Sequence, residues 1–242
     1  TNLETLVKGL VIVGALTVGA LTLANKADAR TICVGSPTSA PCDTTCASIQ
    51  DGINAAVAGD TVLVANGIYD QGDGYINWNG KDIVLRGEDR DSTIIKGSAN
   101  VNPYTIFRIN NITNNSIIEN CTLQLYSTPP APYRKTIHIL NSSGDSLNVG
   151  PTIQNNKILG PARDGSGVYV DGGVGNKPLH PLIIDNEITG FYIGVKGYGY
   201  NTLSTLLGCT LSNNDYAIEM MNARSIIGSQ QGVLTGNSNG TN

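Results

Sequence analysis

The sequence predicts an all-β fold in which short strands wind into a parallel β-solenoid. The chain is rich in turn residues and poor in charge, with 29 Gly and only 14% charged residues among its 242 residues. Short apolar stretches alternate with Gly, Asn and Asp clusters that are too short to contain a crossover helix. A block of sequence also recurs about every 23 to 36 residues, which is a spacing typical of stacked structural repeats.

The chain opens with an uncharged apolar run at 9–25, which lies between Lys8 and an Ala-x-Ala site before Arg30. This is the anatomy of a secretory signal, so we expect export, with only a transient passage through the membrane. Three interpretations stay open: a signal peptide, a membrane anchor, and a retained segment that packs against copies of itself. The run is short for a spanning helix, which needs about 20 apolar residues, and we favour the retained segment. Its expected assembly residues are Leu10, Ile12, Val13, Leu16, Val18 and Leu21.

The N-terminal segment resembles the processed end of type IV pilin-like subunits, whose apolar helices bundle in a filament core. Glu4 stands one place before the acidic position of that family, and Lys8 departs from the pattern of such a core. β-Branched residues such as Val11 and Ile12 also permit a strand donated to a neighbouring subunit. The resemblance implies a homopolymer and leaves helix or donated strand open.

Five cysteines are present, and three of them crowd together at Cys33, Cys42 and Cys46. In an exported chain this crowding predicts a disulfide within the loop, with the pairing left open. No Cys-x-x-Cys pair occurs and only two histidines are present, so neither a zinc site nor another metal or cofactor is predicted. We therefore expect an apolar segment at 1–30, a cysteine-bearing loop at 31–47 and a solenoid domain at 48–242.

The solenoid domain is expected to begin with a short amphipathic helix at 48–57. Ser48 is a plausible N-cap, and the apolar face consists of Ile49, Ile53, Ala56 and Val57. The period then changes to that of strands, first at 61–64 and next at 75–78, 83–85 and 93–95. Short strands without intervening helices leave a sandwich, a barrel or a solenoid as the possible architectures.

The recurring block favours the solenoid among these architectures. It is clearest at 153–160 and 184–190, with looser versions at 118–123 and 207–213. Inward Ile, Val and Leu side chains of one coil would stack on those of the next, while Gly or Asn at the corners would adopt positive φ. An Asn that recurs at one corner predicts a side-chain ladder along the stack, and simple solvent-exposed turns are the alternative.

Residues 47–97 resemble the opening of right-handed parallel β-helix proteins of the pectin lyase-like superfamily. The resemblance is carried by 48–53, 58–64, 67–69, 83–87 and 93–97. It implies a right-handed parallel β-helix over about 47–235, in which the helix caps the open end of the solenoid. We expect about 7 or 8 coils, stacked about 4.8 Å apart.

The catalytic signatures of that superfamily are missing, since Asn-Thr-Asp, Asp-Asp, Gly-His-Gly and Gln-Asp-Thr-Leu do not occur. Asp185 and Glu187 are the best remaining pair for acid and base chemistry or calcium, because residues two apart share one face of a strand. His138 alternates with Ile137 and Ile139 and is expected to face outward, without a nucleophile motif beside it. Sugar or subunit contacts are expected from the rings of Phe191, Tyr192, Tyr198 and Tyr200.

Two classes of function remain open for an extracellular or cell-surface protein. The missing signatures and the apolar N-terminus favour a structural subunit of a filament or surface assembly. The alternative is a secreted β-helix protein that binds or degrades polysaccharide, and the sequence leaves enzymatic activity undecided. The formal net charge of −4 gives no basic patch for nucleic acid, so no nucleic-acid partner is expected.

Overall fold

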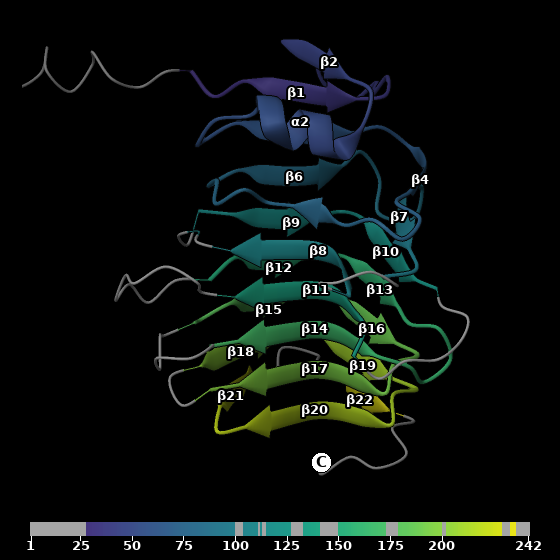
Figure 1. Ribbon diagram of the computed structural model, residues 1–242, viewed down its shortest axis with the longest axis vertical. Coiled ribbons are helices and arrows are strands. Elements are labelled where there is room, and N and C mark those ends of the chain that lie inside the picture. The colour runs from purple at the N-terminus through teal and green to yellow at the C-terminus, as the bar shows by residue number, and fades with distance from the viewer. Residues whose placement is uncertain are drawn as a thin grey trace, which may run out of the picture.

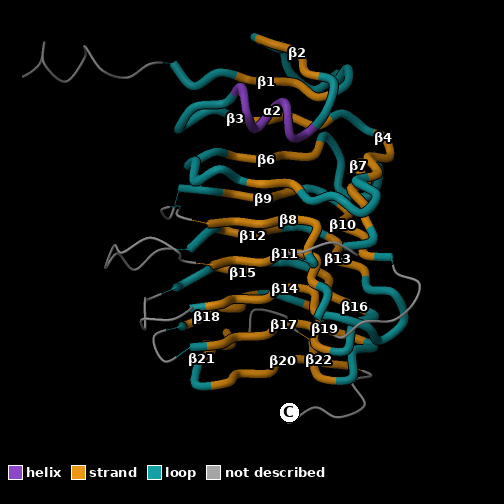
Figure 2. Tube along the Cα trace, viewed as in Figure 1, coloured by secondary structure: helices purple, strands orange, loops and turns teal. Residues whose placement is uncertain are grey.

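A computed structural model describes residues 28–99, 104–110, 112, 115–126, 133–140, 150–172, 179–199, 202–228 and 233–235. Within these residues the strands form three parallel sheets that run side by side along one axis (Figure 1). The predicted all-β parallel β-helix is confirmed. Loops turn the chain from each sheet to the next, and Figure 2 shows them at the corners of the stack.

The strands of each sheet follow in spatial order. Sheet A contains β2 (Thr44–Cys46), β1 (Thr31–Val34), β3 (Thr61–Val64), β6 (Val84–Gly87), β9 (Ile117–Glu119), β12 (Thr152–Gln154), β15 (Leu182–Ile184), β18 (Leu203–Leu207) and β21 (Arg224–Gly228). Sheet B contains β22 (Val233–Thr235), β19 (Thr210–Ser212), β16 (Glu187–Thr189), β13 (Lys157–Leu159), β10 (Thr122–Leu125), β7 (Thr93–Gly97) and β4 (Gly67–Asp70). Sheet C contains β20 (Tyr216–Met221), β17 (Ile193–Tyr198), β14 (Ser166–Asp171), β11 (Lys135–Leu140), β8 (Thr105–Asn110) and β5 (Ile76–Asn77).

Each coil takes one strand from each sheet. In the described residues, six coils from β3–β5 to β18–β20 carry all three strands, and β21 and β22 begin a seventh. This agrees with the expected 7 or 8 coils. Apolar side chains stack between coils, and one inward row of sheet A is buried from β3 to β18: Val62, Leu85, Ile118, Ile153, Ile183 and Leu206. Burial of each such side chain contributes about 1.5 to 3 kcal/mol, so these rows hold the coils together.

Helix α2 (Ile49–Ala55) confirms the predicted helix at the start of the solenoid. Ser48 is its N-cap and accepts a hydrogen bond from the N–H of Asp51, while Ile49 and Ile53 are buried at this end of the core. The helix lies near β1 and β3 at one end of the stack (Figure 1). The expected helical position of Val57 was wrong, because the helix ends at Ala55 and the Val57 side chain is exposed.

The expected loop at 31–47 differs from the structure, which builds two strands of sheet A from it. Strand β1 pairs with β3 and β2 pairs with β1, so the sheet begins before residue 48. A disulfide joins Cys33 to Cys42, as predicted for this region, and Cys46 is free. The apolar run at 9–25 and its six assembly residues lie outside the described residues. No helix within the described part of the chain is long and apolar enough to cross a membrane.

The corner between sheets A and B carries the predicted ladder. Asn186 accepts hydrogen bonds at Oδ1 from the N–H of Asn156 (2.9 Å) and from its Nδ2 (3.1 Å). Asn156 in turn accepts the N–H of Cys121 at 3.0 Å. At the other end, Cys209 accepts the N–H of Asn186 through its sulfur. The two buried thiols therefore terminate a ladder whose middle consists of Asn side chains.

Candidate functional site

A row of polar side chains, most of them titratable, crosses the outer face of sheet C. Parallel register aligns Asn77, Arg108, His138, Tyr169, Lys196 and Glu219 on successive strands. We call these six residues the sheet C row. Side chains alternate between the two faces of a strand, so the inward burial of Ile137 and Ile139 directs His138 outward, as predicted. The row brings together residues more than a hundred positions apart in the sequence.

His138 lies in the middle of the sheet C row, and its side chain is only 12% exposed. Its ring stacks on Tyr169 with 5.1 Å between the ring centroids. Among the described residues neither ring nitrogen has a hydrogen-bond partner, although Nε2 lies 3.6 Å from Oδ2 of Asp171. Burial lowers the pKa of His138, and Asp171 opposes this effect only in part. The imidazole is therefore held in its neutral form near neutral pH.

Three cations lie on the same face as this histidine. Nζ of Lys135 lies 5.1 Å from the centroid of the Tyr169 ring, and burial lowers the pKa of this lysine. Burial also raises the pKa of Tyr169 to about 12. Lys196 pairs with Glu219 at 3.1 Å, and Nε of Arg108 is buried without a hydrogen-bond partner in the described part of the chain. Perturbed titratable groups that gather on one face are a mark of functional sites.

The balance of charge on this face is positive although the whole chain is acidic. The three cations Arg108, Lys135 and Lys196 face the two carboxylates of Asp171 and Glu219. Exposed tyrosine rings lie on or beside the same strands: Tyr104 (43%), Tyr133 (72%), Tyr192 (39%) and Tyr198 (42%). Cations bind carboxylates and exposed rings stack on sugars, so the face combines the two kinds of contact that an acidic sugar polymer requires.

The predicted pair Asp185 and Glu187 does come together, but the geometry assumed for it was wrong. Asp185 has φ of +52° and forms the corner before β16, so the two residues do not alternate along one strand. Both line an open pocket of about 370 Å³ together with Arg90 and Asn155. Among the described residues, no three His, Cys, Asp or Glu side chains gather closely enough to hold a metal ion.

The predicted aromatic contacts divide into buried and exposed rings. Phe191 is fully buried in the core, so its expected contact with a sugar or a subunit was wrong. Tyr192 is exposed and packs edge-on against Tyr216, with ring centroids 5.4 Å apart. Tyr198 is exposed and pairs in register with Asp171, and both residues lie at the C-terminal ends of their strands. Tyr200 lies outside the described residues.

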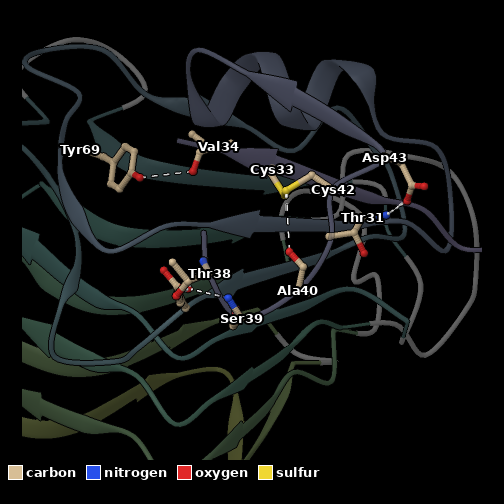
Figure 3. The surroundings of a disulfide bond; sticks show 10 residues. Thr31, Cys33, Val34, Thr38, Ser39, Ala40, Cys42, Asp43 and Tyr69 are labelled. Carbon is tan, nitrogen blue, oxygen red and sulfur yellow. Dashed lines mark hydrogen bonds between the residues drawn. A yellow bond between two sulfur atoms is a disulfide. The ribbon is translucent and has the colours of Figure 1, made fainter. Parts of the chain in front are cut away.

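A second cavity, of about 240 Å³, lies on the outer face of sheet A beside the disulfide loop. Figure 3 shows this loop around Cys33 and Cys42, with Thr38 and Ser39 on it. Glu88 accepts hydrogen bonds from the backbone N–H groups of both Thr38 and Ser39, which ties the loop to the sheet. The Thr38 hydroxyl also donates to Glu88, at 2.8 Å, and this bond contributes most to lowering the pKa of Glu88. The backbone bonds add to the effect, so Glu88 is held in its ionised form. The carboxylate that borders the cavity therefore already accepts its hydrogen bonds from the loop.

Arg108, Tyr169 and Lys196 were not predicted from the sequence as members of one site. Each lies between two buried residues, as Tyr169 does between Val168 and Val170, and this alternation was the available signal. Alternation shows that a residue faces outward but not which strand lies beside it. The register between coils was therefore needed to assemble the row.

Comparisons with known proteins indicate the fold. No family model matches the chain, and no curated protein sequence matches it. Among solved structures, a pectin methylesterase in complex with hexasaccharide VII matches with a TM-score of 0.54 and 16% identity. The rice weevil pectin methyl esterase matches with a TM-score of 0.55 and 15% identity, and PemA from Erwinia chrysanthemi with 0.52 and 14%.

Each of these three matches covers 85% of this chain and 68% of the matched chain. Identities this low establish a likeness of fold alone. The comparisons give no support to the resemblance to type IV pilin-like subunits. In its architecture, the chain is a parallel β-helix whose fold is similar to that of these pectin methylesterases.

Proposed function

We propose that this chain is a secreted protein that binds acidic polysaccharide on the outer face of sheet C. The observation that carries the proposal is the sheet C row with its excess of cations. Arg108, Lys135 and Lys196 lie on three different strands, so a ligand that meets all three must extend across several coils. A polymer that bears one carboxylate per sugar satisfies this requirement better than a small anion does.

The dimensions of the solenoid support a polymeric ligand. Neighbouring strands lie about 4.8 Å apart, so the row repeats a side-chain position at each coil along the axis. Exposed Tyr104, Tyr133 and Tyr192 provide rings along the edge of sheet C where its strands begin. A sugar chain that runs along the axis would meet a cation and a ring in successive coils.

Two further observations agree with this proposal. One of the solved structures with this fold is a pectin methylesterase in complex with a hexasaccharide, so a β-helix of this fold can hold a sugar chain. The Cys33–Cys42 disulfide fits an oxidising location outside the cytoplasm. The proposal concerns binding, because the catalytic signatures of the superfamily are missing from the sequence.

Polymer binding by surface cations is measured directly by titration calorimetry with polygalacturonate at low salt. Lys135→Gln and Lys196→Gln should each weaken binding by about 3- to 10-fold, because each removes one cation from the face. Lys157→Gln is the matched control, since Lys157 lies on sheet B and pairs with Asp91 at 2.9 Å. Added salt should weaken binding of the wild type.

Two outcomes would contradict the proposal. The first is equal binding of polygalacturonate and of a neutral polymer such as dextran, which would remove the role of charge. The second is an equal effect of Lys157→Gln and Lys196→Gln, which would remove the role of sheet C. The expected filament role stays a prediction, because its assembly residues lie outside the described residues.

A further inference from the structure

The environment of His138 is unusual because charged groups approach it from every neighbouring strand of sheet C. Arg108 on β8 lies beside it in register, and Lys135 lies on its own strand, β11. The groups on β14, β17 and β20 that share this face are Tyr169, Asp171, Lys196, Tyr198 and Glu219. Of these, Asp171 is the carboxylate that lies within 4 Å of the imidazole.

The ring of His138 is neutral near neutral pH and has no fixed hydrogen-bond partner among the described residues. Both ring nitrogens are buried, and neither has a hydrogen-bond partner in the described part of the chain. A structural histidine in a core normally donates from one nitrogen to a fixed acceptor. An imidazole that is stacked on Tyr169 and left without such a bond is free to change its charge when an anion approaches the face.

We infer that His138 is a proton-coupled specificity residue, whose protonation strengthens the binding of polyanions to the outer face of sheet C. This inference rests on the proposed function. A charged imidazole would add a fourth cation to Arg108, Lys135 and Lys196, against the unchanged carboxylates of Asp171 and Glu219. The imidazolium would also attract Asp171 and so release Lys135 from it, because both cations compete for one carboxylate.

Thermodynamic linkage makes this coupling reciprocal. If a proton on His138 strengthens polyanion binding, a bound polyanion must draw a proton onto His138 by the same factor. The ligand then adds negative charge to that of Asp171, which faces Lys135 as well as the imidazolium. His138 acts through the charges around it and need not contact the polymer itself, since its nitrogens are covered.

The experiment is calorimetric titration of polygalacturonate into the full chain between pH 5.5 and 8, in two buffers with different heats of ionisation. The wild type should bind about 3- to 10-fold more tightly at pH 5.5 than at pH 8, with uptake of a proton. His138→Gln should bind with little pH dependence and no proton uptake. His180→Gln is the matched control, because it removes the other histidine of the chain, and it should behave as the wild type.

NMR of the histidine rings gives an independent readout that needs no variant at this position. The two histidines are told apart with His180→Gln, and the titration of His138 should move to higher pH when polygalacturonate is added. Tight binding that is independent of pH, with no movement of the His138 titration, would overturn this inference and leave the proposed function standing. Absence of binding at every pH would overturn the proposed function itself.

Discussion

Replacement of Asn186 by Ala tests the ladder at the corner between sheets A and B. Asn186 is 1% exposed and bonds to both sides of its coil. Its Oδ1 accepts from the backbone N–H and the side chain of Asn156, and its Nδ2 donates to the carbonyls of Ile153 (2.8 Å) and Ile184 (2.9 Å). The substitution removes these four bonds without removing apolar contacts.

The expected cost follows from the groups that remain. The buried N–H of Asn156 would have no acceptor, which costs about 1 to 3 kcal/mol. The carbonyls of Ile153 and Ile184 would each lose a bond worth about 0.5 to 1.5 kcal/mol. We therefore expect Asn186→Ala to lower the free energy of unfolding by about 4 kcal/mol, within about 2 to 6. For a chain of this size the melting temperature should fall by about 2 to 4 °C per kcal/mol.

Urea unfolding measures this loss with two probes. Far-UV circular dichroism reports on all coils, while the fluorescence of the single tryptophan, Trp78, reports on the N-terminal coils. Coincident shifts would show that the coils unfold together. Asn155→Gly is the matched control, because Asn155 has φ of +50° and an exposed side chain. It removes one exposed hydrogen bond, from Nδ2 of Asn155 to Oδ1 of Asn120 at 2.8 Å, and should cost no more than about 1 kcal/mol.

Asn186→Cys completes the series, because a sulfur already occupies this ladder position at Cys121 and Cys209. A cysteine at 186 should lose less stability than an alanine, since its sulfur accepts the N–H of Asn156. The reasoning would be refuted by an Asn186→Ala protein within 1 kcal/mol of the wild type, or by an equal loss in Asn155→Gly.

Three further predictions follow from single contacts. As the pH falls from about 7 to about 5, the wild type should lose more stability in urea unfolding than His138→Gln, because burial lowers the pKa of His138 and the unfolded chain binds the proton first; parallel pH profiles would contradict this. Reduction of Cys33–Cys42 should cost roughly 2 to 3 kcal/mol, since the bond closes a loop with a sequence separation of 9; an unchanged urea midpoint would argue against it. Gly87→Ala should cost about 3 kcal/mol, because the added Cβ would lie 2.0 Å from the carbonyl oxygen of Asn120 on the next coil; wild-type unfolding would disprove the close contact.

Helix α2 shows which features can be predicted from neighbouring residues alone. Ser48 and the apolar positions Ile49 and Ile53 were predicted and confirmed, because capping and periodicity act within a few residues. The position of Val57 was not, because a distant contact sets it. The carboxylate of Asp60 accepts the N–H of Val57 at 2.9 Å while it pairs with Arg30, thirty residues away. That contact fixes the extended backbone after the helix.

The pair at Asp185 and Glu187 shows why strand alternation fails at corners. The repeated blocks were recognised from their sequence, although the second begins one residue earlier than expected, because Ile153 pairs with Ile183. The place of Asp185 is held in the preceding coil by Asn155 with φ of +50°. An Asn at a repeated corner is the signal for positive φ, and it applied equally to Asp185. The sheet C row could not be predicted for another reason. The coils differ in length, so the sequence alone does not show which outward-facing residues of successive coils become neighbours.

Alternate residues of the same strands have different roles: those that face inward stabilise the fold, and those that face outward form the proposed binding face. On β14, Val168 and Val170 are buried while Tyr169 between them faces outward, so the outer row can change without opening the core. His138 is the exception. Its ring faces outward but is buried, so a change in its charge alters the free energy of unfolding as well as the charge of the outer face. Without ligand, its protonation costs folding free energy as the pH falls below about 6.5. A bound polyanion adds a counter-charge to that of Asp171, so the acid-induced loss of stability should shrink in its presence. A pH profile of unfolding that stays the same with and without polygalacturonate, in a protein shown to bind it, would separate the two roles and restrict His138 to folding.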